Sequence, residues 1–298
     1  MIKSHGRYDY VSIDDRPDYS WPNGKRLAVY VALNIEQFSY GEGKGAAIAP
    51  PEQSNTHSIY SWRDYGNRVG FWRLMDLFDE LGIPIEAQMN TAIYDECPDI
   101  PVRLRDRGDE ILGHGITNSF VHSDLAENEE RQLIEEITNT IEAHEGKRPM
   151  GYMTPWLACT EVTPDLLAEA GYRYFMDWAA DDQAIWMRTR SGRILSIPYP
   201  IEANDTRGIV WNRYTAQDFA DMVIDNFDEM LLQSEKQPLI CPIAIHPFVV
   251  GRPYRMKQMR RALEHVKRHA GDIWLTRPGD ICTFIEGLPA GVVPGSEG

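Results

Sequence analysis

Four residues of this sequence have types and positions suited to general acid–base chemistry or to binding a metal. Glu36 ends the apolar stretch AVYVALNIE, and His246 ends the apolar stretch CPIAIH. His114 lies between two glycines in EILGHGITNSF, and Asn118 follows it four positions later. A carboxylate in a partly dry site has a raised proton affinity and can take a proton from water. An imidazole has an unperturbed pKa near neutrality, so it can protonate a leaving group.

Each of these residues also has a second interpretation. Glu36 could be a solvated strand end, and His246 could be a structural histidine with satisfied hydrogen bonds. For His114 the residue types leave three roles open: a metal ligand, a proton carrier, or a polar residue at the end of a strand. The flanking glycines favour exposure of its ring, whichever of these roles it has.

Further polar residues are candidates for binding or orienting. The segment DWAADDQ holds Asp177, Asp181 and Asp182, which could orient a histidine or Arg68; at least one of the three is expected to be solvated. Arg68 falls in the first turn of a predicted helix. Since the helix dipole disfavours a cation there, we expect Arg68 to contact a carboxylate or the substrate. His57 and His122 lie in predicted loops and are interpreted as surface residues.

The framework that must position these side chains is an alternation of strands and helices. Apolar stretches such as RLAVYVALNIE, IPIEAQMN and PLICPIAIHP predict buried strands. Helical spacing predicts a helix ending at Gly82 and a long amphipathic helix that begins near Ser123 or Asp124 and ends at Gly146. Around seven such units predict an α/β fold, a distorted (β/α) barrel of parallel strands.

A barrel of this kind places its reactive residues at the C-terminal ends of the strands. The polar residues that end the predicted strands are Glu36, His114, Thr154, Asp177 and His246. These positions follow from the strand assignments alone, so their convergence at one end of the barrel indicates an enzyme.

The domain organisation is expected to be simple. Residues 1–25 are polar and aromatic and predict an arm, residues 26–287 a single barrel domain, and residues 288–298 a flexible tail. Within the barrel domain, residues 37–62 have no clear period and predict a long loop. The aromatic residues of this loop favour an ordered segment that could exclude water from the site as a lid.

Composition excludes several classes of function. The formal net charge is -15 over 298 residues, which disfavours binding to nucleic acids and to anionic membranes. The four cysteines have no CxxC spacing, and no apolar run resembles a signal or a transmembrane helix. We therefore expect reduced thiols and a cytoplasmic location. No GxxxxGK[ST], GxGxxG or HExxH motif is present.

The order and spacing of several segments resemble the polysaccharide deacetylase family, and within it the cytoplasmic, allantoinase-like branch. The resemblance covers about residues 20–285, and it rests on LNIEQ, YGNRVGFWRLMDLFDELGIPIEAQMN, EILGHGITN, GYMTPW, VTPDLLAEAGYRYFMDW, IPYPIEAND and AIHPFVVGRPYRM. It implies a distorted barrel and hydrolysis of an amide C–N bond that is not a peptide bond.

The departures from the family pattern bear on metal binding. Metal-dependent members carry two adjacent aspartates where this chain has Glu36 and Gln37, and two histidines where it has His114 and Asn118. Amide oxygens are poor ligands for zinc, so no cofactor is favoured. The alternative is a divalent metal such as zinc held by Glu36, His114 and a rearranged third ligand, either His122 or an aspartate of DWAADDQ. The family arginine before the GYMTPW proline is replaced by threonine, and Arg68 could substitute for it.

The function predicted on this basis is that of an amidohydrolase acting on a small linear or cyclic amide or ureide. Glu36 would activate water, His246 would protonate the leaving nitrogen, and His114 would hold the substrate carbonyl or its oxyanion. We expect a small-molecule substrate and a homo-oligomer. The alternatives are a metal-dependent N-deacetylase of an N-acetylated sugar and a non-catalytic binding barrel. The predicted substrate-binding residues are Gln37, Asn118, Arg68, Trp156, Asp177 and Asp182.

Overall fold

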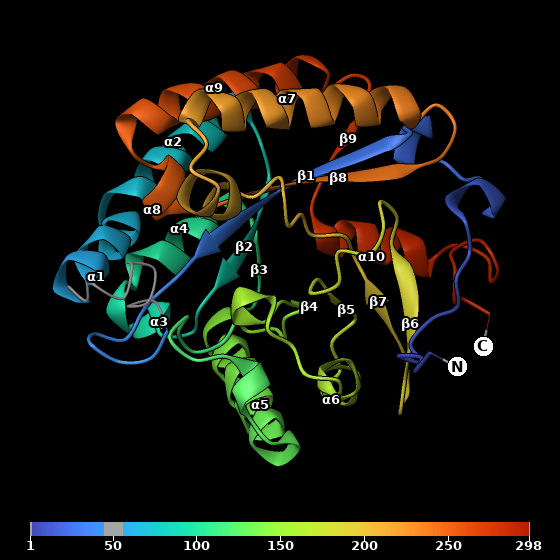
Figure 1. The fold of residues 1–298 in the computed structure, drawn as a ribbon, viewed down its shortest axis with the longest axis horizontal. Helices are drawn as coiled ribbons and strands as arrows, with labels where there is room; N and C mark the ends of the chain where they lie inside the picture. Colours follow the sequence, from blue (N-terminus) through green and yellow to red (C-terminus); the bar gives the residue numbers. More distant parts are fainter. Residues whose placement is uncertain (1, 45–55, 298) are drawn as a thin grey trace.

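A curled, mostly parallel β-sheet forms the centre of the protein (Figure 1). The computed structural model describes residues 2–44 and 56–297. In that part of the chain the sheet has nine strands, in the order β6-β7-β5-β4-β3-β2-β1-β8 with β9 paired to β1. Their bounds are β1 Leu27–Ile35, β2 Ile85–Met89, β3 Glu110–Gly113, β4 Gly151–Tyr152, β5 Tyr174–Phe175, β6 Ile185–Thr189, β7 Gly192–Ser196, β8 Leu239–Ile245 and β9 Trp274–Leu275.

This architecture confirms the predicted distorted (β/α) barrel. The strands from β7 to β8 pair in parallel, and only β6 and β7 form an antiparallel hairpin at the edge. Along β1, Val29, Val31 and Leu33 pack in one core cluster, while the alternate residues Tyr30 and Ala32 pack in another. A strand buried on both faces reads as one apolar run, which is why its sequence does not alternate.

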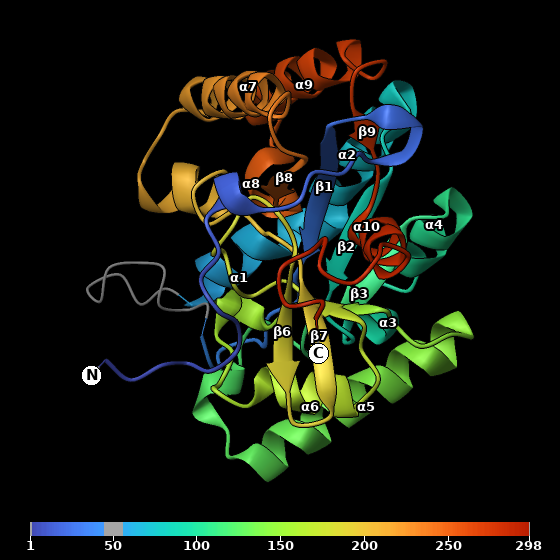
Figure 2. The same ribbon diagram turned by 90° about the vertical axis from the view of Figure 1, so that its right-hand side faces the viewer.

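Helices cover the outer face of the sheet. Figures 1 and 2 show α7 and α9 side by side over β1 and β8, and α5 beside the part of the sheet that contains β3 and β4. The helices are α1 Thr56–Tyr65, α2 Phe71–Leu81, α3 Ile93–Glu96, α4 Asp99–Arg107, α5 Glu127–Glu145, α6 Thr163–Glu169, α7 Ala216–Gln233, α8 Pro247–Val250, α9 Pro253–Arg268 and α10 Pro278–Glu286.

The predicted loop over residues 37–62 is wrong at its C-terminal end, because α1 begins at Thr56 and continues through a π-helical turn, Gly66–Gly70, into α2. Residues 45–55 of the predicted loop lie outside the described residues. Gly66 allows this helical segment to approach α8: a Cβ atom there would lie 2.8 Å from the backbone nitrogen of Phe248. Close packing therefore fixes the segment beside the end of β8.

The start of the long amphipathic helix also differs from the prediction. His122–Asp124 form a separate 3-10 turn, and α5 begins after Ala126. The carboxylate of Glu129 accepts a hydrogen bond from the backbone nitrogen of Ala126 at 2.9 Å. The first turn is thus stabilised by an acidic residue inside the helix, so the expected cap at Ser123 or Asp124 is not used.

Both predicted terminal segments lie against the barrel. In the arm, Arg7 pairs with Asp165 at 2.7 Å. Residues 288–297 contradict the expected flexible tail: Val293 is buried, and the backbone nitrogen of Trp186 in β6 donates to the carbonyl of Pro294 at 2.9 Å. The tail covers the hairpin of β6 and β7 at the edge of the sheet. Neither the sequence of β6 nor that of the tail indicates this contact.

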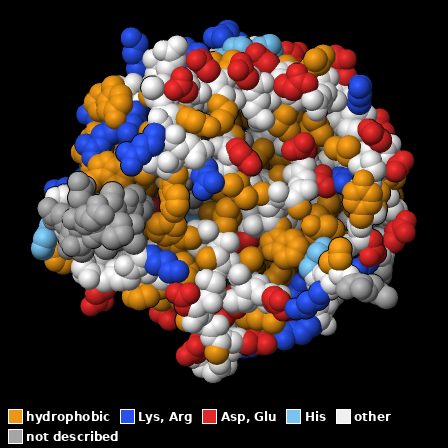
Figure 3. All heavy atoms as spheres, in the orientation of Figure 1, with side chains coloured by type: hydrophobic (Ala, Val, Ile, Leu, Met, Phe, Trp, Pro, Cys, Tyr) orange, Lys and Arg blue, Asp and Glu red, His pale blue; other side chains and the backbone are white. Residues whose placement is uncertain are grey.

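The four cysteines, which all lie in the described segments, are free thiols. Within residues 2–44 and 56–297, no helix has both the length and the apolar character needed to cross a membrane. On the face drawn in Figure 3, hydrophobic side chains gather around the middle, and Asp and Glu side chains lie mostly toward the edge.

Candidate active site

A cavity of about 180 Å³ opens where β1, β3 and β8 end. It contains the three residues predicted to be catalytic, together with aromatic, amide and arginine side chains that line its wall and mouth. The lining residues are Asn34, Glu36, Arg63, His114, Met153, Trp156, Leu157, Tyr199, Ile201, Asn204, Thr206, Arg207, Val210, Trp211, His246 and Phe248. This is the C-terminal end of the parallel strands, as expected for an enzyme of this architecture.

Glu36 and His246 meet in this cavity because β1 and β8 are parallel neighbours that end at the same level. Leu33 pairs with Ile245 in the register, so each functional side chain follows its strand directly. The Nε2 atom of His246 lies 3.4 Å from Oε1 of Glu36. The sequence prediction that these two residues share a site is consistent with this geometry.

A third residue, Asp205, orients His246. Its Oδ1 lies 2.6 Å from Nδ1 of His246, and its Oδ2 accepts a hydrogen bond from the backbone nitrogen of His246 at 2.9 Å. Asp205 follows Asn204, which forms a bridge with Ala244 of β8, so this irregular segment runs beside the strand. The ring of His246 is therefore held with Nε2 toward Glu36.

The electrostatics of the cavity favour an ionised pair. Burial alone would lower the pKa of His246, but Asp205 and Glu36 outweigh it and raise this pKa to about 9. Burial would raise the pKa of Glu36, but His246 and Arg63 outweigh it and hold this pKa below its ordinary value. At neutral pH the pair consists of a carboxylate and an imidazolium.

Arg63 is the cation beside the base. It lies on α1 with a side chain only 3% exposed, and its Nη1 is 3.6 Å from Oε2 of Glu36. Its guanidinium lies 3.7 Å from the centre of the Phe38 ring. Burial lowers the pKa of Arg63 to about 10, so it stays charged at neutral pH. Its Nε and Nη2 have no hydrogen-bond partner among the described residues.

Arg68 contacts a carboxylate, as predicted, but it does not line the cavity, so the prediction that it binds the substrate or orients the base is wrong. Its side chain is 73% exposed, and its ion-pair partner is Asp64 at 3.8 Å. The helix that holds it begins at Thr56, so Arg68 lies in the π-helical turn and not at a helix start. Five residues of helix rotate a side chain by about 140° from its starting face. Arg63 therefore faces the cavity while Arg68 faces solvent.

His114 lies in the cavity as a neutral imidazole. Burial lowers its pKa to about 4. Its Nδ1 lies 2.9 Å from the carbonyl oxygen of Met153, which requires the proton on Nδ1. Its Nε2 is buried without a partner among the described residues and carries a lone pair. The predicted role of holding a carbonyl or an oxyanion does not fit, because this nitrogen accepts a hydrogen bond and cannot donate one.

The two amides that replace family metal ligands are engaged in other hydrogen bonds. Asn118 donates from Nδ2 to Oε1 of Glu36 at 2.5 Å and accepts from Asn90 at its Oδ1 at 3.0 Å. Gln37 does not line the cavity, and its Oε1 accepts from Nδ2 of Asn67 at 3.1 Å. Asn118 thus orients the base, and Gln37 supports the wall behind it.

The donor set does not fit a divalent metal. Next to Nε2 of His114, the only carboxylate among the described lining residues is Glu36, which already faces the cations Arg63 and His246. The proposed third ligand, His122, is unsuited: it is buried, and its nitrogens lie 2.9 Å from Glu130 and 2.9 Å from the hydroxyl of Tyr152. The prediction that His122 is a surface residue is therefore wrong as well.

The remaining predicted binding residues separate into two groups. Trp156 lines the cavity, adopts φ 66°, and donates from Nε1 to the carbonyl of Asn118 at 2.8 Å. Asp177 instead accepts from the backbone nitrogen of Thr154, Asp181 pairs with Arg16, and Asp182 is exposed. None of the three aspartates lines the cavity, so their predicted contact with a substrate or a histidine is wrong.

Several residues of the site, not all of them lining the cavity, were missed by the sequence reasoning. Asp205 lies in IEAND, a segment with polar residues but no regular period. Arg63 carried a usable signal, because Ile59, Trp62, Arg63 and Gly66 have the i, i+3, i+4, i+7 spacing of one helix face. Arg207 lines the mouth and has no ion pair among the described residues.

Comparison with known proteins finds similarity to one family. A sequence model of the polysaccharide deacetylase family matches residues 52–175, a range that contains His114 and Asn118. A peptidoglycan deacetylase of Helicobacter pylori is 24% identical over 244 residues, which are 71% of this chain and 82% of that protein.

Two solved structures have the same fold over nearly the whole chain. The PuuE allantoinase has a TM-score of 0.79 and 27% identity, covering 88% of this chain and 91% of its own. A probable polysaccharide deacetylase from Pseudomonas aeruginosa PAO1 has a TM-score of 0.80 and 26% identity, covering 90% and 94%. The chain is thus similar to polysaccharide deacetylases, over residues 52–175 in sequence and over nearly its whole length in fold, and this similarity indicates a hydrolase of carbon–nitrogen bonds other than peptide bonds.

Proposed function

We propose that this protein hydrolyses the C–N bond of a small linear or cyclic amide or ureide, with Glu36 as general base and His246 as general acid. The observation that carries the proposal is the ionised pair in the cavity. The carboxylate of Glu36 is ready to accept a proton, and the imidazolium of His246, held by Asp205, is ready to give one. The two groups thus have the protonation states that their roles require.

In the proposed reaction, Glu36 takes a proton from a water molecule whose oxygen attacks the carbonyl carbon. The electron pair of the C=O bond moves to oxygen, and the N–H groups of Arg63 that lack partners donate to this oxyanion. The oxyanion collapses, the C–N bond breaks, and His246 gives its proton to the leaving nitrogen. Transfer of the proton from Glu36 to His246 restores both groups for the next turnover.

The lining of the cavity supports this substrate class. A volume of about 180 Å³ is below the roughly 300–1,000 Å³ of drug-sized ligand sites, so the substrate is small. The buried Nε2 of His114 lacks a partner and would accept from a substrate N–H, which a ureide or a cyclic amide supplies. The allantoinase relative supports a ureide.

Arg207 could bind the part of the substrate that lies at the mouth of the cavity. Its side chain is exposed, lines the cavity and has no ion pair among the described residues. A free guanidinium here suits a carboxylate or a carbonyl on the part of the substrate that faces solvent. We therefore place ureides that carry an acidic group among the first compounds to test.

The first alternative is a metal-dependent N-deacetylase of an N-acetylated sugar. The peptidoglycan deacetylase relative supports this alternative. The donor set argues against it, because Asn118 and Gln37 use their amide oxygens in hydrogen bonds within the protein and Glu36 is already neutralised by two cations.

The second alternative is a barrel that binds a ligand without catalysis. Two buried carboxylates around one imidazolium are costly to desolvate and are readily replaced by apolar residues where only stability matters. The presence of these charged groups in a cavity therefore favours a catalytic protein over one that only binds a ligand. The predicted homo-oligomer and the cytoplasmic location stay predictions.

A panel of ureides, hydantoins, cyclic imides and N-acetylated sugars tests the proposal, with release of carboxylate and of amine or ammonia as the readout. We expect turnover on a ureide or a cyclic amide, and loss of turnover in Glu36→Gln and His246→Ala. Near-normal turnover in both variants on a confirmed substrate would contradict the mechanism. Turnover on N-acetylated sugars alone would favour the first alternative, and no turnover on any compound would favour binding.

A further inference from the structure

A group of potential metal ligands lies on the outer helices, away from the cavity. Asp228 belongs to α7, His265 to α9, and His269 follows α9 directly. These two helices pack side by side on the outer face of the sheet (Figures 1 and 2), and none of the three residues lines the active-site cavity. In the part of the chain that the structure describes, this is the one group of three or more His, Cys, Asp or Glu side chains arranged to hold a metal ion.

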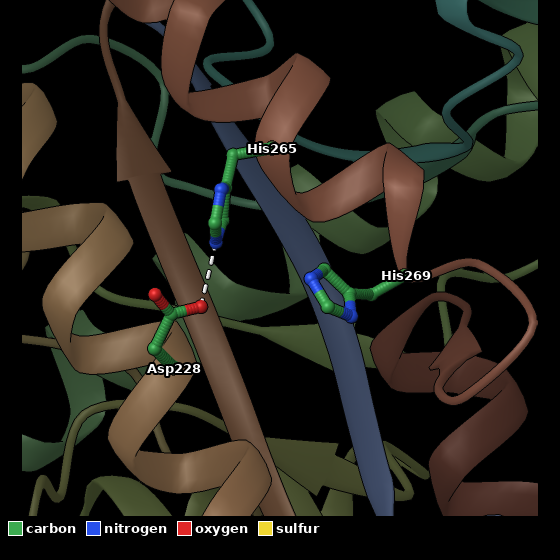
Figure 4. Close-up of side chains that lie close together, drawn as sticks. All are labelled: Asp228, His265 and His269. Atoms are coloured by element: carbon green, nitrogen blue, oxygen red, sulfur yellow. Dashed lines mark hydrogen bonds and ion pairs between the residues drawn. The ribbon is translucent and has the colours of Figure 1, made fainter.

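The geometry of the group is close to that of a metal site. One ligand atom from each residue lies within 4.8 Å of the others. Nε2 of His265 is 2.6 Å from Oδ1 of Asp228, and Figure 4 shows the ring of His269 turned toward this pair. Ligands around tetrahedral zinc lie about 3.3 Å apart, as Zn–N and Zn–O distances of about 2.0–2.1 Å require. Metal binding would therefore require side-chain rotations that bring the three atoms, now within 4.8 Å of one another, to that spacing.

The surroundings of the two imidazoles differ, and only those of His269 already suit a metal at Nε2. Nδ1 of His269 lies 3.4 Å from Oδ2 of Asp272, so a carboxylate holds the proton on the nitrogen that faces away. Nδ1 of His265 accepts from Nη2 of Arg268 at 2.9 Å, which leaves the proton on Nε2. Metal binding therefore requires this proton to move to Nδ1 and the exposed Arg268 side chain to swing away.

Partial burial and charge favour the site further. The side chains of Asp228, His265 and His269 are 51%, 19% and 35% exposed, so a bound ion keeps access to a water molecule as fourth ligand. The protein carries a formal net charge of -15, which attracts a divalent cation. His265 and His269 are four residues apart, a spacing that sets both rings on one side of a helix.

We propose that Asp228, His265 and His269 form a zinc-class divalent metal site that links α7 to α9 and is separate from the catalytic cavity. Two imidazoles and one carboxylate suit Zn²⁺ and its neighbours Co²⁺ and Ni²⁺, and they do not suit Ca²⁺ or Mg²⁺, which prefer oxygen ligands. Zinc found in the purified protein would belong to this site. The zinc content of the wild type, measured alone, would therefore not show that the ion lies in the cavity.

Titration of metal-free, full-length protein with zinc chloride, followed by calorimetry, tests the proposal. We expect about one zinc ion per chain, weakened at least tenfold in His265→Ala, His269→Ala and Asp228→Asn, and an increase in the melting temperature of the wild type with zinc. Magnesium chloride should give no heat beyond dilution. His144→Ala is the matched control, because it removes an exposed helical histidine that stacks on Tyr94.

The catalytic cavity supplies a second control. His114→Ala should keep the stoichiometry and affinity for zinc, whereas the variants of the α7–α9 site should keep the turnover of the wild type. The proposal is wrong if the wild type binds no zinc, or if His265→Ala and His269→Ala bind it as the wild type does. Loss of zinc in His114→Ala would place the ion in the cavity and overturn the proposal too.

Discussion

Nδ1 of His246 lies 2.6 Å from Oδ1 of Asp205, a residue 41 positions earlier in the chain. Because Asp205 also accepts from the backbone nitrogen of His246, both the position and the orientation of the ring are fixed. Nε2 then faces Glu36 at 3.4 Å, with its proton toward the cavity. The arrangement separates the two roles: one carboxylate orients the acid, and the other serves as the base.

Replacing Asp205 should change the pH dependence of catalysis. His246 acts as an acid only while protonated, so activity is lost as the pH rises through its pKa of about 9. Without Asp205, this pKa should fall toward the ordinary histidine value of about 6.5. In Asp205→Asn we expect the alkaline limb of kcat/KM to move to lower pH and its maximum to fall about 10²-fold. The measurement is a full pH profile of kcat/KM.

Asp181→Asn is the control for this change, since Asp181 pairs with Arg16 outside the cavity. Its profile should match that of the wild type. An alkaline limb that does not move in Asp205→Asn would show that Asp205 does not raise the pKa of the general acid.

Arg63 and Arg68 should respond in opposite ways to substitution. Arg63 has two N–H groups without partners beside the base, and we propose that they stabilise the oxyanion. Arg63→Ala should lower kcat by about 10²–10³-fold, as does the loss of one oxyanion donor elsewhere. Arg68→Ala removes an exposed side chain and should leave kcat and KM unchanged. Equal effects of the two substitutions on kcat would contradict this assignment.

His114 should affect substrate binding more than the chemical step. Its Nε2 accepts from the substrate in the bound state and in the transition state alike, so the contact is uniform binding. We expect His114→Ala to raise KM about tenfold with a small change in kcat, and His114→Gln to restore part of the loss through its amide oxygen. Steady-state kinetics on the identified substrate measure both constants. A large loss of kcat with unchanged KM would instead place His114 in the chemical step.

Glu86 inside the barrel should reduce stability as the pH rises. It is fully buried, its Oε1 has no partner among the described residues, and burial together with Glu110 raises its pKa well above 4.5. The folded state therefore holds the proton more tightly than the unfolded state does, and stability is lost as the pH rises above 4.5. As the pH rises from 5 to 8, the free energy of unfolding of Glu86→Gln should increase by about 1–3 kcal/mol relative to that of the wild type.

Urea denaturation at the two pH values measures this gain. Glu135→Gln, on the exposed face of α5, is the matched control and should be no more stable than the wild type. A Glu86→Gln variant that follows the pH dependence of the wild type would show that Glu86 is ionised in the folded protein.

The convergence of Glu36, His114 and His246 could be predicted because parallel strands end together. The apolar runs before Glu36 and His246 are long, and the short run before His114 stops at a glycine, so their ends are visible in the sequence and the fold brings them to one edge. The fold class was accessible for the same reason. Short strands gave a weaker signal: β6 was not predicted, and β4 and β5 each contain only two residues.

The partners of these residues could not be predicted in the same way. Asp205 and Arg63 reach the cavity from an irregular segment and from a helix expected to be a loop, and their contacts depend on packing between distant parts of the chain. Arg68 was chosen because its helix was taken to begin beside it, whereas the helical segment begins at Thr56. His122 was interpreted as exposed, since nothing near it in the sequence signals its hydrogen bond to Glu130.

Turnover of the metal-depleted protein, compared between the wild type and Glu36→Gln, tests the proposed mechanism most directly. Both proteins are treated with a chelator, dialysed, and assayed on the best substrate of the panel at pH 7.5. We predict that the wild type keeps its turnover and that Glu36→Gln loses it by at least about 10³-fold. Turnover that vanishes with the metal and returns with added zinc, or a Glu36→Gln variant with near-normal turnover, would contradict catalysis by Glu36 and His246 alone.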